Sequence, residues 1–82
     1  MYTAYILRCA DGTLYTGITT DVERRVVEHN HSSLGARYTR GRRPVLLVYE
    51  RLFENRSQAS REEARIKQLS RSEKLALISE KK

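Results

Sequence analysis

With 82 residues the chain has room for one domain, and we expect a single domain spanning residues 1–82. No run of about 18 apolar residues is present, which argues against a membrane-spanning helix. The first residues lack the charged lead-in and cleavage site of a signal peptide. The one cysteine, Cys9, cannot form an internal disulfide and is expected to be a small buried residue. These features predict a cytoplasmic protein without a membrane partner.

The charge balance favours a polyanionic partner. Lysines and arginines number 16 against 10 acids, which gives a formal net charge of +6. Solubility alone would explain the excess, but four of the arginines fall within residues 37–43, where there is no acid. That stretch also carries a tyrosine whose ring could stack on a base or a sugar. We therefore expect this segment to bind nucleic acid through Arg37, Tyr38, Arg40, Arg42 and Arg43.

The first quarter of the chain predicts a β-hairpin. Residues 2–9 are apolar and aromatic, and residues 14–19 resume the same character. Between them the dipeptide Asp11-Gly12 is a strong turn signal. We expect two adjacent strands joined by a tight turn.

The middle of the chain predicts a helix, a loop and a strand. Thr20 and Glu23 have the spacing of a capping box, which would begin a helix over residues 21–30. Residues 31–44 contain serines, glycines and the only proline, and predict a loop. The apolar run within residues 45–53 predicts a buried strand, which we expect at the centre of the sheet.

The last third predicts two helices. Residues 57–69 carry one apolar stripe. Ser70 and Glu73 form a second capping box, which would begin a short helix through Ile78. The order is β-β-α-β-α-α, which predicts an α/β (α+β) fold with a small three-stranded sheet and helices packed against it.

The register of the hairpin decides whether its tyrosines can form one site. A glycine within a strand leaves room for a close approach, and Gly17 lies two residues after Tyr15. A two-residue loop would pair Arg8 with Tyr15 and place Tyr5 on the opposite face. A three-residue loop would instead pair Tyr5 with Gly17 and Leu7 with Tyr15, on a single face. A shared site therefore requires the three-residue loop.

Two pairs of polar residues on the predicted helices are candidates for chemistry. Arg25 and His29 are four apart and share a face, where a guanidinium fork and an imidazole suit a phosphate. Alone, this pair is more simply explained as a solvated helix face. Glu62 lies nearer the centre of its apolar stripe, and Glu63 lies at the border, where a carboxylate can reach a metal ion. A surface salt bridge is the simpler explanation of either glutamate in isolation.

Taken in order, these residues resemble the GIY-YIG endonuclease superfamily. No single motif is specific, but the ordered set covers about residues 2–79 and keeps the family's spacing. The two signatures correspond to Thr3-Ala4-Tyr5 and Tyr15-Thr16-Gly17, and the helix over residues 21–30 supplies the family's Arg and His. Residues 35–40 and 63–67 are similar to the short stand-alone bacterial members of the URI-type branch.

This resemblance implies a three-stranded antiparallel sheet flanked by helices, and metal-dependent cleavage of DNA in repair, recombination or DNA processing. By the Glu-x-x-Ile-Lys spacing of the stand-alone branch it also implies Glu63 as metal ligand, whereas other branches would select Glu62. The catalytic residues that it implies are Tyr5, Tyr15, Arg25, His29 and Glu63.

The expected cofactor is one Mg²⁺ or Mn²⁺ ion, because too few carboxylates surround the candidate site for two. If either tyrosine deprotonates the attacking water, a nearby cation must lower its pKa from about 10. Thr3 replaces the first signature glycine. The family's late asparagine has no clear counterpart, since Lys74 and Ser79 occupy that region.

Two other functions compete with the nuclease. A non-catalytic nucleic-acid-binding module would share the charge and the arginine segment, but binding alone requires neither a glutamate nor a matched pair of tyrosines. A small protein-interaction adaptor is the weaker alternative. Because the chain lacks a second recognition domain and the cysteines of a zinc module, we expect weak cutting of low sequence specificity, or a protein partner that supplies specificity.

Overall fold

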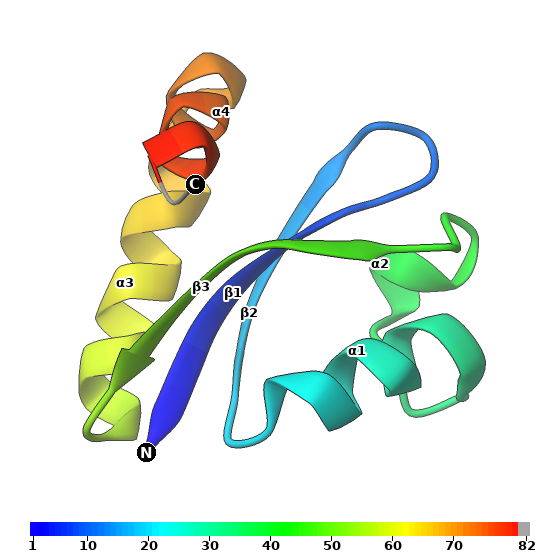
Figure 1. Cartoon of the computed structure of the whole chain (residues 1–82), viewed down its shortest axis with the longest axis horizontal. Helices are drawn as coiled ribbons and strands as arrows, with labels where there is room; N and C mark the ends of the chain where they lie inside the picture. The colour runs from blue at the N-terminus through cyan, green and yellow to red at the C-terminus, as the bar shows by residue number, and fades with distance from the viewer. Residues whose placement is uncertain (81–82) are drawn as a thin grey trace.

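A three-stranded antiparallel sheet separates two groups of helices. The computed structural model describes residues 1–80, so the last two residues of the predicted domain lie outside it. The strands β1 (Tyr2–Arg8), β2 (Leu14–Thr19) and β3 (Leu46–Phe53) are arranged in the order β2-β1-β3. Helix α1 (Val22–His31) and the short α2 (Arg37–Arg40) lie on one side, and α3 (Arg56–Gln68) and α4 (Arg71–Glu80) on the other (Figure 1). The predicted fold class and element order are confirmed, with α2 as a single turn inside the predicted loop.

The hairpin adopts the three-residue loop. The Cys9 amide donates to the Thr13 carbonyl at 2.8 Å, which leaves Ala10, Asp11 and Gly12 as the loop. Gly12 has a φ of 85°, a left-handed conformation that favours glycine. Tyr5 therefore pairs with Gly17, and Leu7 with Tyr15, so both tyrosines share one face of the sheet.

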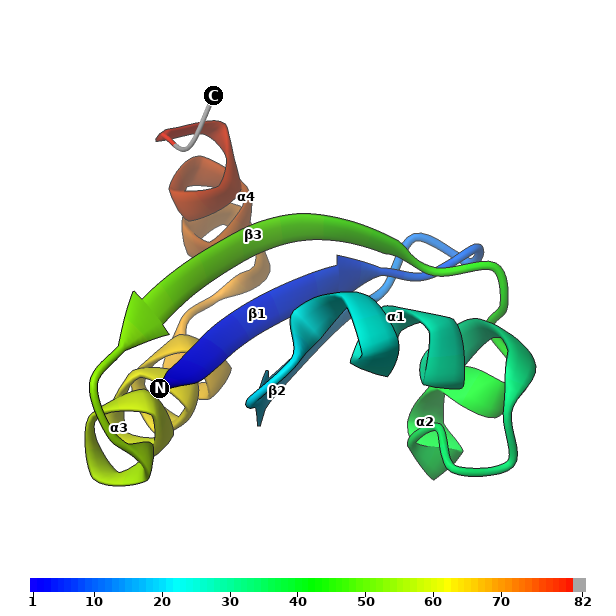
Figure 2. The same cartoon turned by 60° about the horizontal axis from the view of Figure 1, so that its bottom comes forward.

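Strand β3 lies at the edge of the sheet, so its predicted central position is wrong. The central strand is β1, which pairs with both neighbours. The predicted burial of β3 is confirmed only in part, because Tyr49 is buried whereas Leu46 and Leu52 are exposed. Helix α1 lies toward one face of this edge and α4 toward the other (Figure 2). A bulge between Ile6 and Leu7 of β1 leaves Val48 as an extra residue in β3. Leu47 consequently packs toward α1, whereas Val48 and Tyr49 pack toward α3 and α4.

The helix starts confirm one of the two predicted capping boxes. At α4 the Ser70 hydroxyl accepts from the Glu73 amide at 3.2 Å, and the Glu73 carboxylate accepts from the Ser70 amide at 2.8 Å. At α1 the predicted box is wrong by one residue. Asp21 is the N-cap, and its carboxylate accepts from the Arg24 amide at 3.1 Å. A side-chain carboxylate can cap the N-terminus of a helix as well as a hydroxyl can. Thr20 and its neighbour Asp21 were therefore equally suitable as the N-cap of α1.

The small core is divided between the two faces of the sheet. One cluster is formed by Tyr5, Leu7, Cys9 and Val45 under α1, and it confirms the buried position of Cys9. The other is formed by Ile6, Tyr49 and Ile66 under α3 and α4. No helix within residues 1–80 has both the length and the hydropathy to cross a membrane.

Candidate active site

A buried contact between Tyr5 and His29 forms the centre of the candidate site. The Tyr5 hydroxyl oxygen lies 2.9 Å from His29 Nε2, and the two residues are 1% and 0% exposed. Their approach depends on Gly17, the cross-strand neighbour of Tyr5. A Cβ atom there would lie 2.7 Å from the Tyr5 hydroxyl oxygen, so any other residue would displace the ring. The glycine that was singled out in the sequence is thus required by the site itself.

Tyr15 completes a cluster of three rings. Its ring centroid lies 5.2 Å from that of His29 and 6.5 Å from that of Tyr5. Tyr15 is half-buried, whereas Tyr5 is enclosed, so the solvent side of the cluster belongs to Tyr15. The hairpin register and helix α1 together bring these three predicted residues into contact.

The surroundings of His29 keep its ring neutral and set its tautomer. Burial, followed by the charge of Arg25, lowers the pKa of His29 to about 4. The Ala36 amide donates to Nδ1 at 3.3 Å, and the Thr39 hydroxyl oxygen lies 3.0 Å from the same nitrogen. A backbone N–H can only donate, so Nδ1 accepts and the ring proton belongs on Nε2. His29 therefore donates to the Tyr5 oxygen.

Opposing electrostatic effects act on the pKa of the Tyr5 hydroxyl. Burial and then neighbouring Tyr15 raise the pKa of its hydroxyl to about 12, while a hydrogen bond and the charge of Arg25 pull the pKa down. Both Arg25 and the His29 Nε2–H stabilise a phenolate rather than a phenol. At neutral pH a group with this pKa is ionised in about one molecule in 10⁵. A further cation is needed before Tyr5 can serve as a base.

Arg25 is held at the mouth of the site. Its Nη1 donates to the Glu28 carboxylate at 2.8 Å and to the Leu34 carbonyl at 2.7 Å. The hydrogen bond with Glu28 raises the pKa of the guanidinium, which stays charged. Its side chain is 26% exposed, so part of the fork is open to a ligand.

The two adjacent glutamates of α3 have different surroundings. Glu62 is buried, as its place near the centre of the stripe predicted, and Arg65 and Tyr49 bind its carboxylate. Glu63 is half-buried and pairs with Lys67 at 3.3 Å. The charge of Glu63 raises the pKa of Tyr5, which places this carboxylate within electrostatic reach of the tyrosine. Glu62 thus accepts hydrogen bonds from two neighbours, whereas Glu63 has one ion-pair partner within residues 1–80, the exposed Lys67.

Most of the arginine segment is already tied to the protein. Arg42 binds Asp11 at 3.0 Å and lies 4.1 Å from the centre of the Tyr38 ring, which in turn stacks on Tyr15 at 5.7 Å. Arg40 donates to the Ser33 carbonyl, and Arg43 to the carbonyls of His29 and Ser32. Among residues 1–80, Arg37 has neither a hydrogen bond nor an ion pair. The segment therefore borders the ring cluster, with Arg37 as its free cation.

Comparison with known proteins identifies the family. The model of the GIY-YIG catalytic domain matches residues 1–76. The chain belongs to the GIY-YIG family. A UPF0213 protein of Desulfotalea psychrophila is 61% identical over 90% of this chain and 67% of its own length. A UPF0213 protein of Halobacterium salinarum is 57% identical over 95% of this chain and 100% of its own length. These relatives are short, like this chain, which agrees with the predicted stand-alone branch.

Solved structures of relatives share the GIY-YIG fold seen here. The solution NMR structure of a UPF0213 protein from Bacillus halodurans has a TM-score of 0.62 and 49% identity, and the match covers 96% of this chain and 84% of that one. A protein from E. faecalis, also solved by NMR in solution, has a TM-score of 0.62 and 42% identity, with 95% and 83% covered. The fold of residues 1–80 is therefore that of its relatives.

Thr39 is the site residue that the sequence did not reveal. It is fully buried, and its hydroxyl oxygen lies 2.8 Å from the Ala36 carbonyl oxygen and 3.0 Å from His29 Nδ1, so that its one proton serves one of these two acceptors at a time. Nothing in a loop sequence marks one threonine as the partner of a histidine ten residues away. The only hint in the sequence was the glycine at position 35, which marks a close approach of the backbone. A Cβ atom at Gly35 would lie 2.7 Å from the Glu28 carbonyl oxygen. That close approach brings the segment with Ala36 and Thr39 against α1.

The acidic groups of this GIY-YIG site fit a sparsely coordinated cation. Within residues 1–80 no group of three or more His, Cys, Asp or Glu side chains could hold a metal ion between them. Glu63 offers one half-exposed carboxylate, whose partner Lys67 is exposed and long. A single carboxylate suits a Mg²⁺ or Mn²⁺ ion that keeps most of its waters, and does not suit a closed protein cage.

Proposed function

We propose that this chain is a metal-dependent endonuclease that hydrolyses DNA phosphodiester bonds in the cytoplasm, in repair, recombination or DNA processing. The observation that carries the proposal is the hydrogen bond between Tyr5 and His29, which Gly17 makes room for and which lies beside Arg25. A pure binding surface gains nothing from a buried phenol supplied with two hydrogen-bond donors. A protein partner that supplies substrate specificity is part of the proposal, as is the role of the arginine segment in binding DNA.

Each residue of the site has a distinct part in the proposed reaction. In its phenolate form, which His29 Nε2–H and Arg25 both stabilise, Tyr5 orients the attacking water and takes its proton, and so returns to the phenol. Arg25 also faces the phosphate, where its open N–H groups stabilise the charge that develops on the phosphoryl oxygens. Tyr15 packs on His29 at the solvent side of the cluster. Glu63 would hold the divalent ion.

The bound cation would supply positive charge against the phosphate and the leaving oxygen. Burial raises the pKa of Tyr5 to about 12, so Tyr5 alone does not ionise near neutral pH. The nearby negative charge of Glu63 also opposes ionisation of Tyr5, and neutralising that charge favours the phenolate. These electrostatic effects support the proposed metal dependence.

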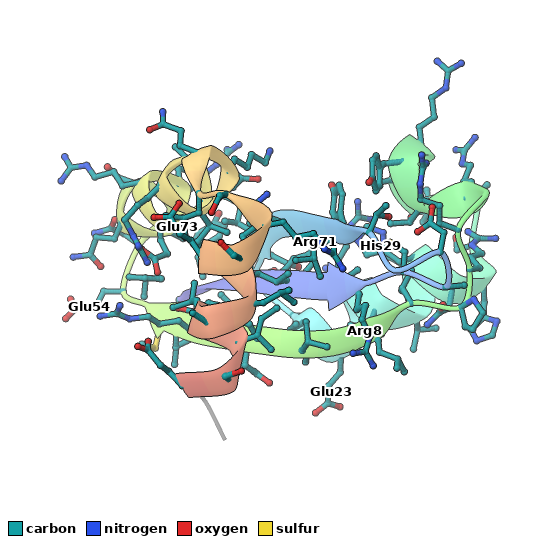
Figure 3. The ribbon with its side chains drawn as sticks, turned by 90° about the horizontal axis from the view of Figure 1, so that it is seen from above. Arg8, Glu23, His29, Glu54, Arg71 and Glu73 are labelled. Atoms are coloured by element: carbon teal, nitrogen blue, oxygen red, sulfur yellow. The ribbon has the colours of Figure 1, made fainter. Side chains whose placement is uncertain are left out.

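The test compares cleavage by the wild type and matched variants. Supercoiled plasmid and labelled flap, nicked and single-stranded DNA are incubated with Mg²⁺, Mn²⁺ or EDTA. Glu63→Gln and Arg25→Gln are expected to lose at least about a hundredfold in rate. Glu54→Gln and Glu23→Gln are the controls, since both side chains point away from the body of the protein in Figure 3. Both controls should cut like the wild type.

Two results would overturn the proposal. One is a wild type that binds all of these substrates and cuts none with any metal, which would make the chain a binding module. The other is cleavage that survives in both Glu63→Gln and Arg25→Gln, which would locate the chemistry elsewhere.

A further inference from the structure

A basic pocket lies between β3 and α3, and none of its lining residues is among those proposed for catalysis. The end of β3 runs beside the first turns of α3 in both Figure 1 and Figure 2. Between them is an open depression of about 400 Å³. Two of its residues come from β3 and four from α3: Arg51, Phe53, Gln58, Arg61, Glu62 and Arg65.

The one acid in this pocket is fully engaged by its neighbours. The Glu62 carboxylate accepts from Arg65 Nε and Nη2, both at 2.8 Å, and from the Tyr49 hydroxyl at 3.2 Å. Both oxygens of this carboxylate are therefore occupied by hydrogen bonds within the protein. Glu62 neutralises one of the three guanidinium groups. The lining residues therefore keep a surplus of two positive charges.

The guanidinium groups retain donors for a ligand. Arg65 uses two of its five N–H groups on Glu62, which fixes its orientation and leaves the rest available. Arg51 lies 3.9 Å from Glu62 and 5.2 Å from the Phe53 ring centre. Arg61 makes no hydrogen bond or ion pair within residues 1–80. Arginines present only for solubility would be spread over the surface, whereas these three converge on one concavity.

Tetrahedral oxyanions match such a set of donors. Guanidinium groups bind phosphate oxygens through paired N–H groups, and several guanidinium groups around one concavity suit a doubly or singly charged phosphate. We propose that the pocket between β3 and α3 binds a phosphate group. That phosphate is either a phosphodiester of DNA outside the cleavage site or a free phosphate monoester. The first source rests on the proposed function, because it takes DNA as the ligand.

The test uses the whole chain in EDTA, so that cleavage plays no part. Amide resonances are followed by NMR during titration with sodium pyrophosphate, and a short fluorescein-labelled DNA duplex reports affinity by anisotropy over a range of salt concentrations. The variant Arg51→Gln/Arg61→Gln removes the two surplus charges. The control Arg8→Gln/Arg56→Gln removes two charges from exposed residues outside the pocket. The variant Arg61→Lys keeps the positive charge and removes the paired N–H donors of the guanidinium group.

Pyrophosphate should shift the resonances of Phe53, Gln58 and Arg61 in the wild type and the control, but not in Arg51→Gln/Arg61→Gln. If the phosphate belongs to DNA, Arg51→Gln/Arg61→Gln should bind the duplex about tenfold more weakly than the control variant does. Its slope of log affinity against log salt should be lower by about 2. The DNA affinity of Arg61→Lys should lie between those of the wild type and Arg51→Gln/Arg61→Gln. Pyrophosphate binding with unchanged DNA affinity would assign the free monoester.

Two further results separate this pocket from the active site. If pyrophosphate shifts none of these resonances and the two double variants bind DNA alike, the pocket is not a phosphate site, whatever the cleavage assay shows. Conversely, loss of the proposed nuclease activity would leave a pyrophosphate response in this pocket intact. All of the substituted arginines are exposed, so each variant is expected to fold, which thermal unfolding verifies.

Discussion

At the scale of single residues, the structure gives Thr39 the task of positioning His29. Its buried hydroxyl lies within hydrogen-bonding distance of both His29 Nδ1 and the Ala36 carbonyl, and its single proton can be donated to either acceptor. Thr39→Val should leave that carbonyl without its side-chain donor and weaken the hold on the ring, with a loss of about 1–3 kcal/mol in stability and a lower cleavage rate. Thr39→Ser, which keeps the hydroxyl, should retain both.

The measurement that separates positioning from simple packing is the ¹⁵N spectrum of the His29 ring. We expect a single Nε2–H tautomer in the wild type and in Thr39→Ser, and a mixture of tautomers in Thr39→Val. A pure Nε2–H tautomer in Thr39→Val would show that the Ala36 amide alone holds the ring, and would leave Thr39 a packing role.

The buried imidazole also predicts how stability depends on pH. Burial and then Arg25 lower the pKa of folded His29 to about 4, against 6.5 for the unfolded chain. Between these values the unfolded chain binds the extra proton, so stability is full above pH 6.5 and falls as the pH approaches 4. This one residue should cost about 2 kcal/mol between pH 7 and pH 5.

Urea unfolding of the wild type and of His29→Gln at both pH values isolates this effect, because the carboxylates titrate alike in both proteins. The wild type should lose more stability than the variant on acidification. Equal losses, or an NMR titration of the His29 ring with a midpoint near 6.5, would contradict the buried, neutral state.

At the scale of elements, the hairpin aligns the site through one glycine. A Cβ at Gly17 would lie 2.7 Å from the hydroxyl oxygen of Tyr5 and 2.8 Å from its Cζ, and the ring is enclosed by the core. Gly17→Ala should therefore displace Tyr5 from His29, with a destabilisation of about 1–3 kcal/mol and a loss of activity of about a hundredfold.

Gly41→Ala is the matched control, because a Cβ there meets nothing within 4 Å and its backbone has a φ of −90°. Cleavage kinetics and thermal unfolding of the two variants test the prediction. If Gly17→Ala cuts as fast as the wild type, the close contact of Tyr5 and His29 does not set the rate.

The sequence predicted those features of the fold that depend on local chemistry. The turn at Asp11-Gly12 and the box of Ser70 and Glu73 each express a rule that acts within a few residues. The pairing of Gly17 with Tyr5 was one of two registers that the sequence allowed, and the length of the loop decides between them. The central position expected for β3 failed because strand order is non-local. The apolar run resembles that of a central strand because Leu47 packs toward one group of helices, and Val48 and Tyr49 toward the other. The bulge at Val48 also hides the alternation of an edge strand. Thr39 stayed hidden for the same reason, since only the folded chain brings it to His29.

At the scale of the whole molecule, the net charge of +6 is divided between arginines that hold the fold together and arginines that are free. Arg43 is half-buried and donates to the carbonyls of His29 and Ser32, at the end of α1. Such donors satisfy the last carbonyls of a helix and offset its dipole. Arg37, in the same segment, is exposed and without a partner among residues 1–80. The segment of residues 37–43 thus contains one arginine that stabilises the fold and one whose charge is free to bind a ligand.

These two arginines should therefore respond differently to the same substitution. Arg37→Gln should leave the melting temperature unchanged, weaken DNA binding uniformly across sequences, and lower the slope of log affinity against log salt by about 1, the value for one phosphate contact. Arg43→Gln should cost about 1–3 kcal/mol of stability, because two carbonyls at the end of α1 lose their donor. Anisotropy titrations over a range of salt, paired with thermal unfolding, measure both quantities. If Arg37→Gln binds DNA like the wild type at every salt concentration, the phosphates do not pass over this segment, and the wild type's own slope must come from cations elsewhere on the molecule.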